Sequence, residues 1–303
     1  MKRNGSPVAT VLLVATTLIS IYLLFVLVFR SPGVQVTSSD PAATSSPVSK
    51  KVGGPATEAH PAAVGAAGEK HVRKPNPDEA LQLLKSGNER FYSGKAAYPN
   101  ADTARLALAG RENQGNYAYA TVISCSDSRV PVEFIFDAGV MDIFVIRVAG
   151  NVCDTDEIGS IEYGLAHVNT PVLVVLGHTQ CGAVTAVTHM LHGDGHALER
   201  NIPPLVDNII PAVKRALDQN KDVHGDAIIP YAIEENVWQG VEDLFMKSPA
   251  VRTIVKEGKA KVVGAIYDVA TGKVDWLGAE KVDEIMKRVE ASPDKETKAF
   301  AAK

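Results

Sequence analysis

Apolar runs of strand length alternate with helical segments through the middle of this 303-residue chain. Residues 120–124 and 142–148 are rich in β-branched side chains, and residues 171–176 and 261–267 are mostly apolar. Continuous runs of this kind are typical of strands that are covered on both faces. Because helices alternate with them, we predict an α/β domain with a mostly parallel central sheet flanked by helices.

The helical segments bound this domain. Helices are predicted from Asp78 onward with an interruption around Gly87, and over residues 156–169, 182–191, 203–219 and 234–247. Residues 261–267 are predicted to turn through 270–273 into an edge strand at 274–276. We therefore predict a folded domain over residues 75–291, with a charged tail at 292–303.

The first 30 residues have a different character. An uncharged apolar run extends from Val8 to Phe29, and a helix needs roughly 20 residues to cross a bilayer core. A secretory signal has a shorter apolar region, roughly 7–15 residues, and residues 28–32 are a poor cleavage site. We predict an uncleaved transmembrane helix within residues 1–30, with a cleaved signal and secretion as the alternative. Lys2 and Arg3 precede the run, which favours a cytoplasmic N-terminus and a domain outside the cytoplasm, periplasmic in a bacterium.

Residues 31–74 are rich in Ala, Pro, Ser, Thr and Gly and have no strand or helix period. Such a segment cannot bury enough apolar surface to offset its ordering entropy. We interpret it as a disordered, flexible linker between the membrane helix and the domain.

Composition excludes two classes of protein. The 35 acidic and 31 basic side chains nearly balance, and no basic stripe indicates a nucleic-acid partner. The three cysteines, Cys125, Cys153 and Cys181, are too few and too far apart for a disulfide framework.

Two motifs lie where a predicted strand runs into a loop. Residues 125–131 read Cys-Ser-Asp-Ser-Arg-Val-Pro, and residues 177–182 read Gly-His-Thr-Gln-Cys-Gly. Ligands bind at the carboxyl ends of strands in open α/β sheets. Thiolate and imidazole are good zinc donors, and a catalytic zinc keeps three protein ligands and one open position. Cys125, His178 and Cys181 are therefore the predicted zinc ligands.

Asp127 and Arg129 follow the first cysteine at intervals of two residues. Arg129 is expected to hold the Asp127 carboxylate ionised in a two-pronged ion pair. A structural ion pair that caps a turn is the commoner arrangement in general, but the neighbouring Cys125 favours a catalytic pair here. Cys153 is expected to be a small buried side chain rather than a ligand, and His189, His192 and His196 to be solvated polar residues.

Together the two motifs resemble those of the β-class carbonic anhydrases. The resemblance extends through residues 86–91, 136–139, 147–151 and 160–164, and so covers most of the chain from Asp78 to Gly278. It implies a zinc enzyme that hydrates carbon dioxide reversibly to bicarbonate and a proton, by activating water for attack on the carbon. It also implies that the aspartate, here Asp127, can coordinate zinc in a closed, inactive form and that pairing with Arg129 opens the site. A homodimer or higher even oligomer is implied, with each active site at a subunit interface.

The substrate contacts are less sharply defined by the sequence. Gln114, Val130 and Gly182 are the candidate contacts for carbon dioxide, and Phe134 is a further candidate wall of the pocket. Plant-like members of the family carry a glutamine where this chain has Asn116, so Gln114 fits only with a small insertion. Members with a bicarbonate inhibitory site carry a tryptophan at the position of Val122, so the resemblance does not imply that regulation here.

Two other functions fit the same motifs. Some relatives hydrolyse carbon disulfide or carbonyl sulfide, which have the shape of carbon dioxide. A non-catalytic protein could use Cys125, Asp127, His178 and Cys181 as a closed structural zinc site. Arg129, which can draw Asp127 away from the metal, argues against the structural site.

Overall fold

The computed structural model describes residues 73–195 and 197–301. The predicted membrane helix at 1–30, most of the predicted linker and His196 lie outside these residues. Within the described ranges, no helix combines the length and the apolar character that crossing a bilayer requires.

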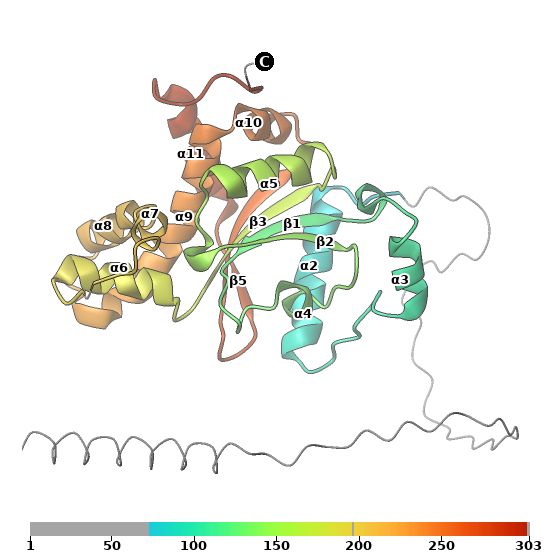
Figure 1. The fold of residues 1–303 in the computed structure, drawn as a ribbon, viewed down its shortest axis with the longest axis horizontal. Coiled ribbons are helices and arrows are strands. Elements are labelled where there is room, and N and C mark those ends of the chain that lie inside the picture. Colours follow the sequence, from blue (N-terminus) through green and yellow to red (C-terminus); the bar gives the residue numbers. More distant parts are fainter. Residues whose placement is uncertain (1–72, 196, 302–303) are drawn as a thin grey trace, which may run out of the picture. The chain divides into compact units, whose positions relative to one another are not determined.

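A five-stranded sheet with the order β2-β1-β3-β4-β5 forms the centre of the domain (Figure 1). Its strands are β1 (Ala120–Ser124), β2 (Ile143–Arg147), β3 (Val172–His178), β4 (Lys261–Tyr267) and β5 (Val274–Trp276). The first four strands run parallel and β5 pairs antiparallel with β4. The predicted mostly parallel sheet and its terminal hairpin are therefore confirmed.

Helices cover both faces of this sheet (Figure 1). The α-helices are α2 (Pro77–Tyr92), α3 (Thr103–Ala109), α4 (Val132–Ile135), α5 (Thr155–Ala166), α6 (Gly182–His192), α7 (Pro203–Val206), α8 (Ile210–Gln219), α9 (Ile229–Lys247), α10 (Pro249–Lys256) and α11 (Ala279–Ala291). Single turns of 3-10 helix are η1 (Gln114–Asn116), η2 (Ala149–Asn151) and η3 (Gly225–Ile228). One core lies between the sheet and α5, α9 and α11, and a second between the sheet and α2 and α4. All seven residues of β3 are buried as a result, as its apolar sequence predicts.

Helix α2, the first in the described part of the chain, continues past the glycine that was expected to interrupt it. Asn76 caps α2 by accepting a hydrogen bond from the Glu79 amide, while Glu79 bonds back to the Asn76 amide. The helix then continues through Gly87 to Tyr92. A Cβ at Gly87 would lie only 1.9 Å from the carbonyl oxygen of Phe136. Gly87 therefore allows close packing against a backbone rather than a helix break, and the expected interruption is wrong.

A single helix over residues 203–219 is also wrong. The structure has two helices, α7 and α8, separated at residues 207–209. Pro211 lies in the first turn of α8, where its missing N–H costs no helical hydrogen bond. A proline at this position fits the start of a new helix better than the interior of a long one.

Candidate metal centre

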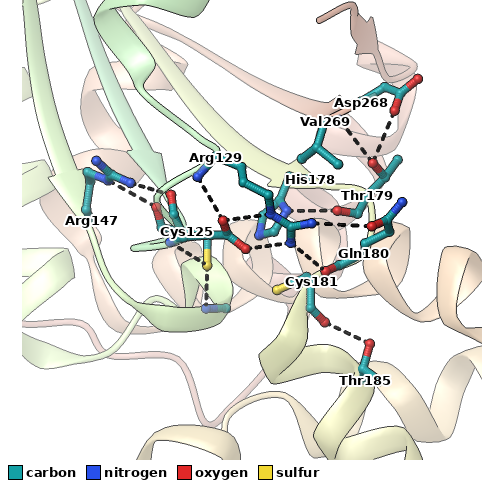
Figure 2. Close-up of polar contacts among 12 residues, drawn as sticks. Cys125, Arg129, Arg147, His178, Thr179, Gln180, Cys181, Thr185, Asp268 and Val269 are labelled. Carbon is teal, nitrogen blue, oxygen red and sulfur yellow. Dashed lines mark hydrogen bonds and ion pairs between the residues drawn. The ribbon is translucent and has the colours of Figure 1, made fainter. Parts of the chain in front are cut away.

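Three side chains of types that can bind a metal converge at the carboxyl ends of two adjacent strands (Figure 2). Cys125 directly follows β1, His178 ends β3, and Cys181 is the N-cap of α6. Because β1 and β3 are parallel neighbours, with Ser124 opposite Leu176, their following loops meet at one edge of the sheet. One ligand atom from each of Cys125, His178 and Cys181 lies within 4.8 Å of the other two, and all three residues are buried.

The imidazole of His178 is oriented as a metal ligand requires. Its Nδ1 lies 2.9 Å from the carbonyl oxygen of Thr179, so the proton belongs on Nδ1 and Nε2 carries a free lone pair. Nε2 is buried and has no hydrogen-bond partner among the described residues. A buried polar atom without a partner costs free energy, and a bound cation would remove that cost. The site therefore fits a zinc ion on the chemistry of its donors.

The two thiols are surrounded by hydrogen-bond donors. The Sγ atom of Cys125 accepts from the amides of Asp127 at 3.4 Å and Gly150 at 3.3 Å. A hydrogen bond from Cys181, together with those from the two amides, lowers the pKa of the Cys125 thiol. The same contact with Cys125, together with burial, raises the pKa of Cys181. A metal ion bound by both side chains as thiolates would displace any proton that they hold.

The two-pronged ion pair expected between Asp127 and Arg129 is present. Arg129 Nε donates to Asp127 Oδ1 at 3.0 Å, and Nη2 donates to Oδ2 at 2.7 Å. Hydrogen bonds from the Arg129 side chain hold the pKa of the Asp127 carboxyl well below its usual range. Both carboxylate oxygens thus face the guanidinium, and Asp127 does not belong to the group of converging metal ligands. Three protein donors remain for a metal.

Two residues to which the sequence analysis assigned no role, Gln180 and Arg147, hold this arrangement in place. Arg129 Nη2 and Nη1 donate to the backbone oxygen and to Oε1 of Gln180, at 3.1 and 3.3 Å. Gln180 has a φ of 57°, in the left-handed region that residues other than glycine rarely adopt. Arg147, at the end of β2, donates to the carbonyl oxygens of Cys125 and Asp127 at 3.1 and 2.6 Å. Both residues lie inside motifs that the sequence shows, residues 177–182 and 147–151, but their roles depend on contacts between segments far apart in the chain.

The candidate substrate contacts are distributed unevenly. Gly182 directly follows Cys181 at the start of α6, whereas Val130 is fully buried in the core beneath α2 and α4. Phe134 is 54% exposed and packs edge to face against Tyr98. Gln114 lies in η1, before β1 begins. The neighbouring Gly115 lies close to the carbonyl oxygen of Val168, which precedes β3. Gln114 is therefore at the amino ends of the strands, away from the three ligands of the same chain.

Cys153, His189 and His192 lie outside the candidate metal centre. Cys153 is fully buried against α9, and burial raises the pKa of its thiol. Its expected role as a small buried side chain is confirmed. His189 Nε2 lies 2.9 Å from a carboxylate oxygen of Asp226, and His192 is exposed at the end of α6. Neither histidine shares a metal-binding group with other described residues.

Comparisons with known proteins agree with this geometry. A family model described as carbonic anhydrase matches residues 120–274. Carbonic anhydrase 2 of Mycobacterium tuberculosis is 35% identical over 199 residues, covering 65% of this chain and 91% of that protein. The β-carbonic anhydrase CcaA has a similar structure, with a TM-score of 0.50, 26% identity and coverage of 65% and 91%. A structure from a study of two tetrameric β-carbonic anhydrases of Sordaria macrospora gives a TM-score of 0.50 at 23% identity, with coverage of 65% and 96%.

Proposed function

The chain belongs to the β-class carbonic anhydrase family, and we propose that Cys125, His178 and Cys181 hold the zinc ion with which it hydrates carbon dioxide. The reaction is the reversible conversion of carbon dioxide and water to bicarbonate and a proton. The observation that carries this assignment is the convergence of two thiols and a free imidazole nitrogen within 4.8 Å of one another. A zinc ion bound there supplies Lewis acidity, which lowers the pKa of a coordinated water.

In this proposal Asp127 orients the reacting water. Its carboxylate is kept ionised by Arg129, so it accepts a hydrogen bond from the water and directs a lone pair toward the carbon of carbon dioxide. Arg129 in turn keeps Asp127 off the metal, because its guanidinium engages both carboxylate oxygens. A closed structural site would need Asp127 as the fourth ligand, and the ion pair supports a catalytic site instead.

The role of Asp127 is tested by stopped-flow hydration with zinc-loaded protein. Asp127→Asn keeps the shape of the side chain and removes its charge, and we expect kcat to fall by roughly 10²-fold, at the lower end of what a positioned acid or base contributes. Asp226→Asn is the matched control, because Asp226 is exposed and pairs with His189 outside the centre. Equal rates for Asp127→Asn and the parent protein would remove Asp127 from the mechanism.

We also propose that the working unit is a homodimer or higher even oligomer. Tyr98 and Phe134 stack edge to face with ring centres 5.9 Å apart, and each is more than half exposed. An exposed aromatic pair of this kind is typical of a surface that another protein covers. Gln114 could reach a metal centre only in a second copy, since it lies at the other end of its own strands. Light scattering of the parent protein and of Phe134→Ser at several concentrations tests this interface. We expect the variant to have a lower average molar mass than the parent protein, and an equal molar mass would argue against the interface.

We propose, finally, that the domain lies outside the cytoplasm on a membrane anchor. The support is the uncharged run from Val8 to Phe29 with Lys2 and Arg3 before it. Fractionation followed by protease treatment of intact cells tests the placement. Recovery in the membrane fraction with a protease-sensitive domain is expected, whereas recovery in the cytosol would contradict it.

A further inference from the structure

The hairpin between β4 and β5 is bonded to the loop that carries two of the proposed zinc ligands (Figure 2). The amide of Thr179 donates to the carbonyl oxygen of Tyr267 at 2.9 Å. Its hydroxyl donates to Asp268 Oδ1 at 3.3 Å and accepts from the amide of Val269 at 3.1 Å. The amide and hydroxyl of Thr179 are therefore both bonded to the hairpin, which lies about 90 residues further along the chain.

The third polar group of Thr179 faces the metal centre. Its carbonyl oxygen lies 2.9 Å from Nδ1 of His178. Because that contact places the proton on Nδ1, it leaves Nε2 free and sets the rotation of the ring. Thr179 thus connects the hairpin on one side with the imidazole on the other.

The carboxylate of Asp268 is itself held in place. Asp268 Oδ1 also accepts from the Ala270 amide at 3.0 Å, and Oδ2 accepts from the Thr271 hydroxyl at 2.7 Å. The turn is closed by the Gly272 amide, which donates to the Asp268 carbonyl oxygen at 2.9 Å. Asp268 therefore presents a fixed acceptor to Thr179 rather than a mobile side chain.

From these contacts we infer that Thr179 and Asp268 are positioning residues that hold the imidazole of His178 in the orientation required for metal binding. The inference rests on the proposed function, since it takes His178 as a zinc ligand. Neither residue touches the metal or the substrate. Each acts through the carbonyl oxygen of Thr179, so its removal is expected to weaken metal binding before it affects the chemical step.

The test is the zinc dissociation constant, measured with the full-length protein by competition against a chromophoric chelator. Thr179→Val keeps the shape of the side chain and removes the hydroxyl, so its bonds to Asp268 and Val269 are lost. Partners of a metal-binding histidine typically change affinity 10- to 100-fold. Thr179 acts partly through its backbone, which keeps its own bond to Tyr267, so we expect zinc binding to weaken about 10-fold. Thr179→Ser retains the hydroxyl and is expected to restore the affinity.

A second threonine provides the control. The hydroxyl of Thr253 donates to the Pro249 carbonyl oxygen at 3.0 Å on an exposed part of α10, and Thr253→Val is expected to leave zinc binding unchanged. Asp268→Ala is expected to match Thr179→Val. Parent-like zinc affinity in both Thr179→Val and Asp268→Ala would overturn the inference while leaving the zinc enzyme intact. Failure of the folded parent protein to bind zinc would overturn the proposed function and, with it, this inference.

Discussion

Gly177, the residue before His178, is expected to tolerate no side chain unless helix α9 shifts away from β3. A Cβ at Gly177 would lie 2.7 Å from Cγ2 of Val237, whereas carbon atoms pack best at 3.5–4.0 Å. Val237 is fully buried in α9, and its β-branched side chain strongly prefers one rotamer in a helix, so it cannot easily rotate away from a new methyl group. Gly177→Ala therefore overpacks the core, which typically costs about 1–3 kcal/mol.

The same contact predicts the effect of the compensating change. Val237→Ala removes two buried methyl groups, worth about 1.6 kcal/mol in transfer free energy at about 0.8 each, and the cavity adds to this cost. In the double variant the new methyl of residue 177 occupies part of that cavity. We expect the double variant to be more stable than the sum of the single changes predicts, by at least about 1 kcal/mol.

Urea unfolding of the four proteins of this cycle, at one protein concentration, gives the coupling free energy directly. Zinc affinity is measured on the same samples, because His178 shifts with its neighbour and Gly177→Ala is expected to weaken zinc binding. If the two changes add within about 0.5 kcal/mol, as they do at independent sites, Val237 is not the group that excludes a side chain at Gly177.

Three further outcomes are expected. Burial raises the pKa of Asp243 to about 6, although Gln239 donates a hydrogen bond to it at 2.8 Å; the folded protein then holds a proton that the unfolded chain releases. The contribution of Asp243 to the free energy of unfolding therefore falls as the pH rises from about 4 to about 6, by up to about 3 kcal/mol at about 1.4 kcal/mol per pKa unit. In Asp243→Asn this part of the pH dependence, measured by urea unfolding at several pH values, is expected to be absent. The free energy of unfolding, measured in urea, is expected to be about 1 kcal/mol lower for Gln180→Val than for Gln180→Gly, because a β-branched residue fits poorly at a φ of 57°. Equal unfolding midpoints for the two variants would show that the loop relaxes. Cys153→Ala is expected to keep the zinc content of the parent protein by elemental analysis, and loss of zinc would make this buried thiol a ligand.

The strands could be predicted because their physical signal is local. A run such as residues 171–176 is apolar at every position, which suits only a segment covered on both faces. The three candidate metal ligands followed from the same fact, since motifs placed directly after two neighbouring parallel strands meet at one edge of the sheet. Cys125, His178 and Cys181 could thus be grouped before any distance was known.

The parts that could not be predicted depend on contacts between distant segments. Gly87 has the sequence signal of a helix break, and only the nearby carbonyl of Phe136 explains why a glycine stands within a continuous helix. The bonds from Thr179 to Asp268 join residues 89 positions apart, and neither residue type is unusual in a loop. Gln180 likewise gains its role from its backbone conformation and from the position of Arg129.

The zinc K-edge X-ray absorption spectrum of the purified protein is the most direct test of the proposed metal centre. We predict one zinc ion per chain with two sulfur neighbours, one imidazole nitrogen and one further light atom from solvent, since Asp127 is engaged by Arg129. Cys181→Ser is expected to lose one of the two sulfur neighbours. A folded protein without zinc, or a zinc ion without sulfur neighbours, would contradict the assignment of Cys125, His178 and Cys181.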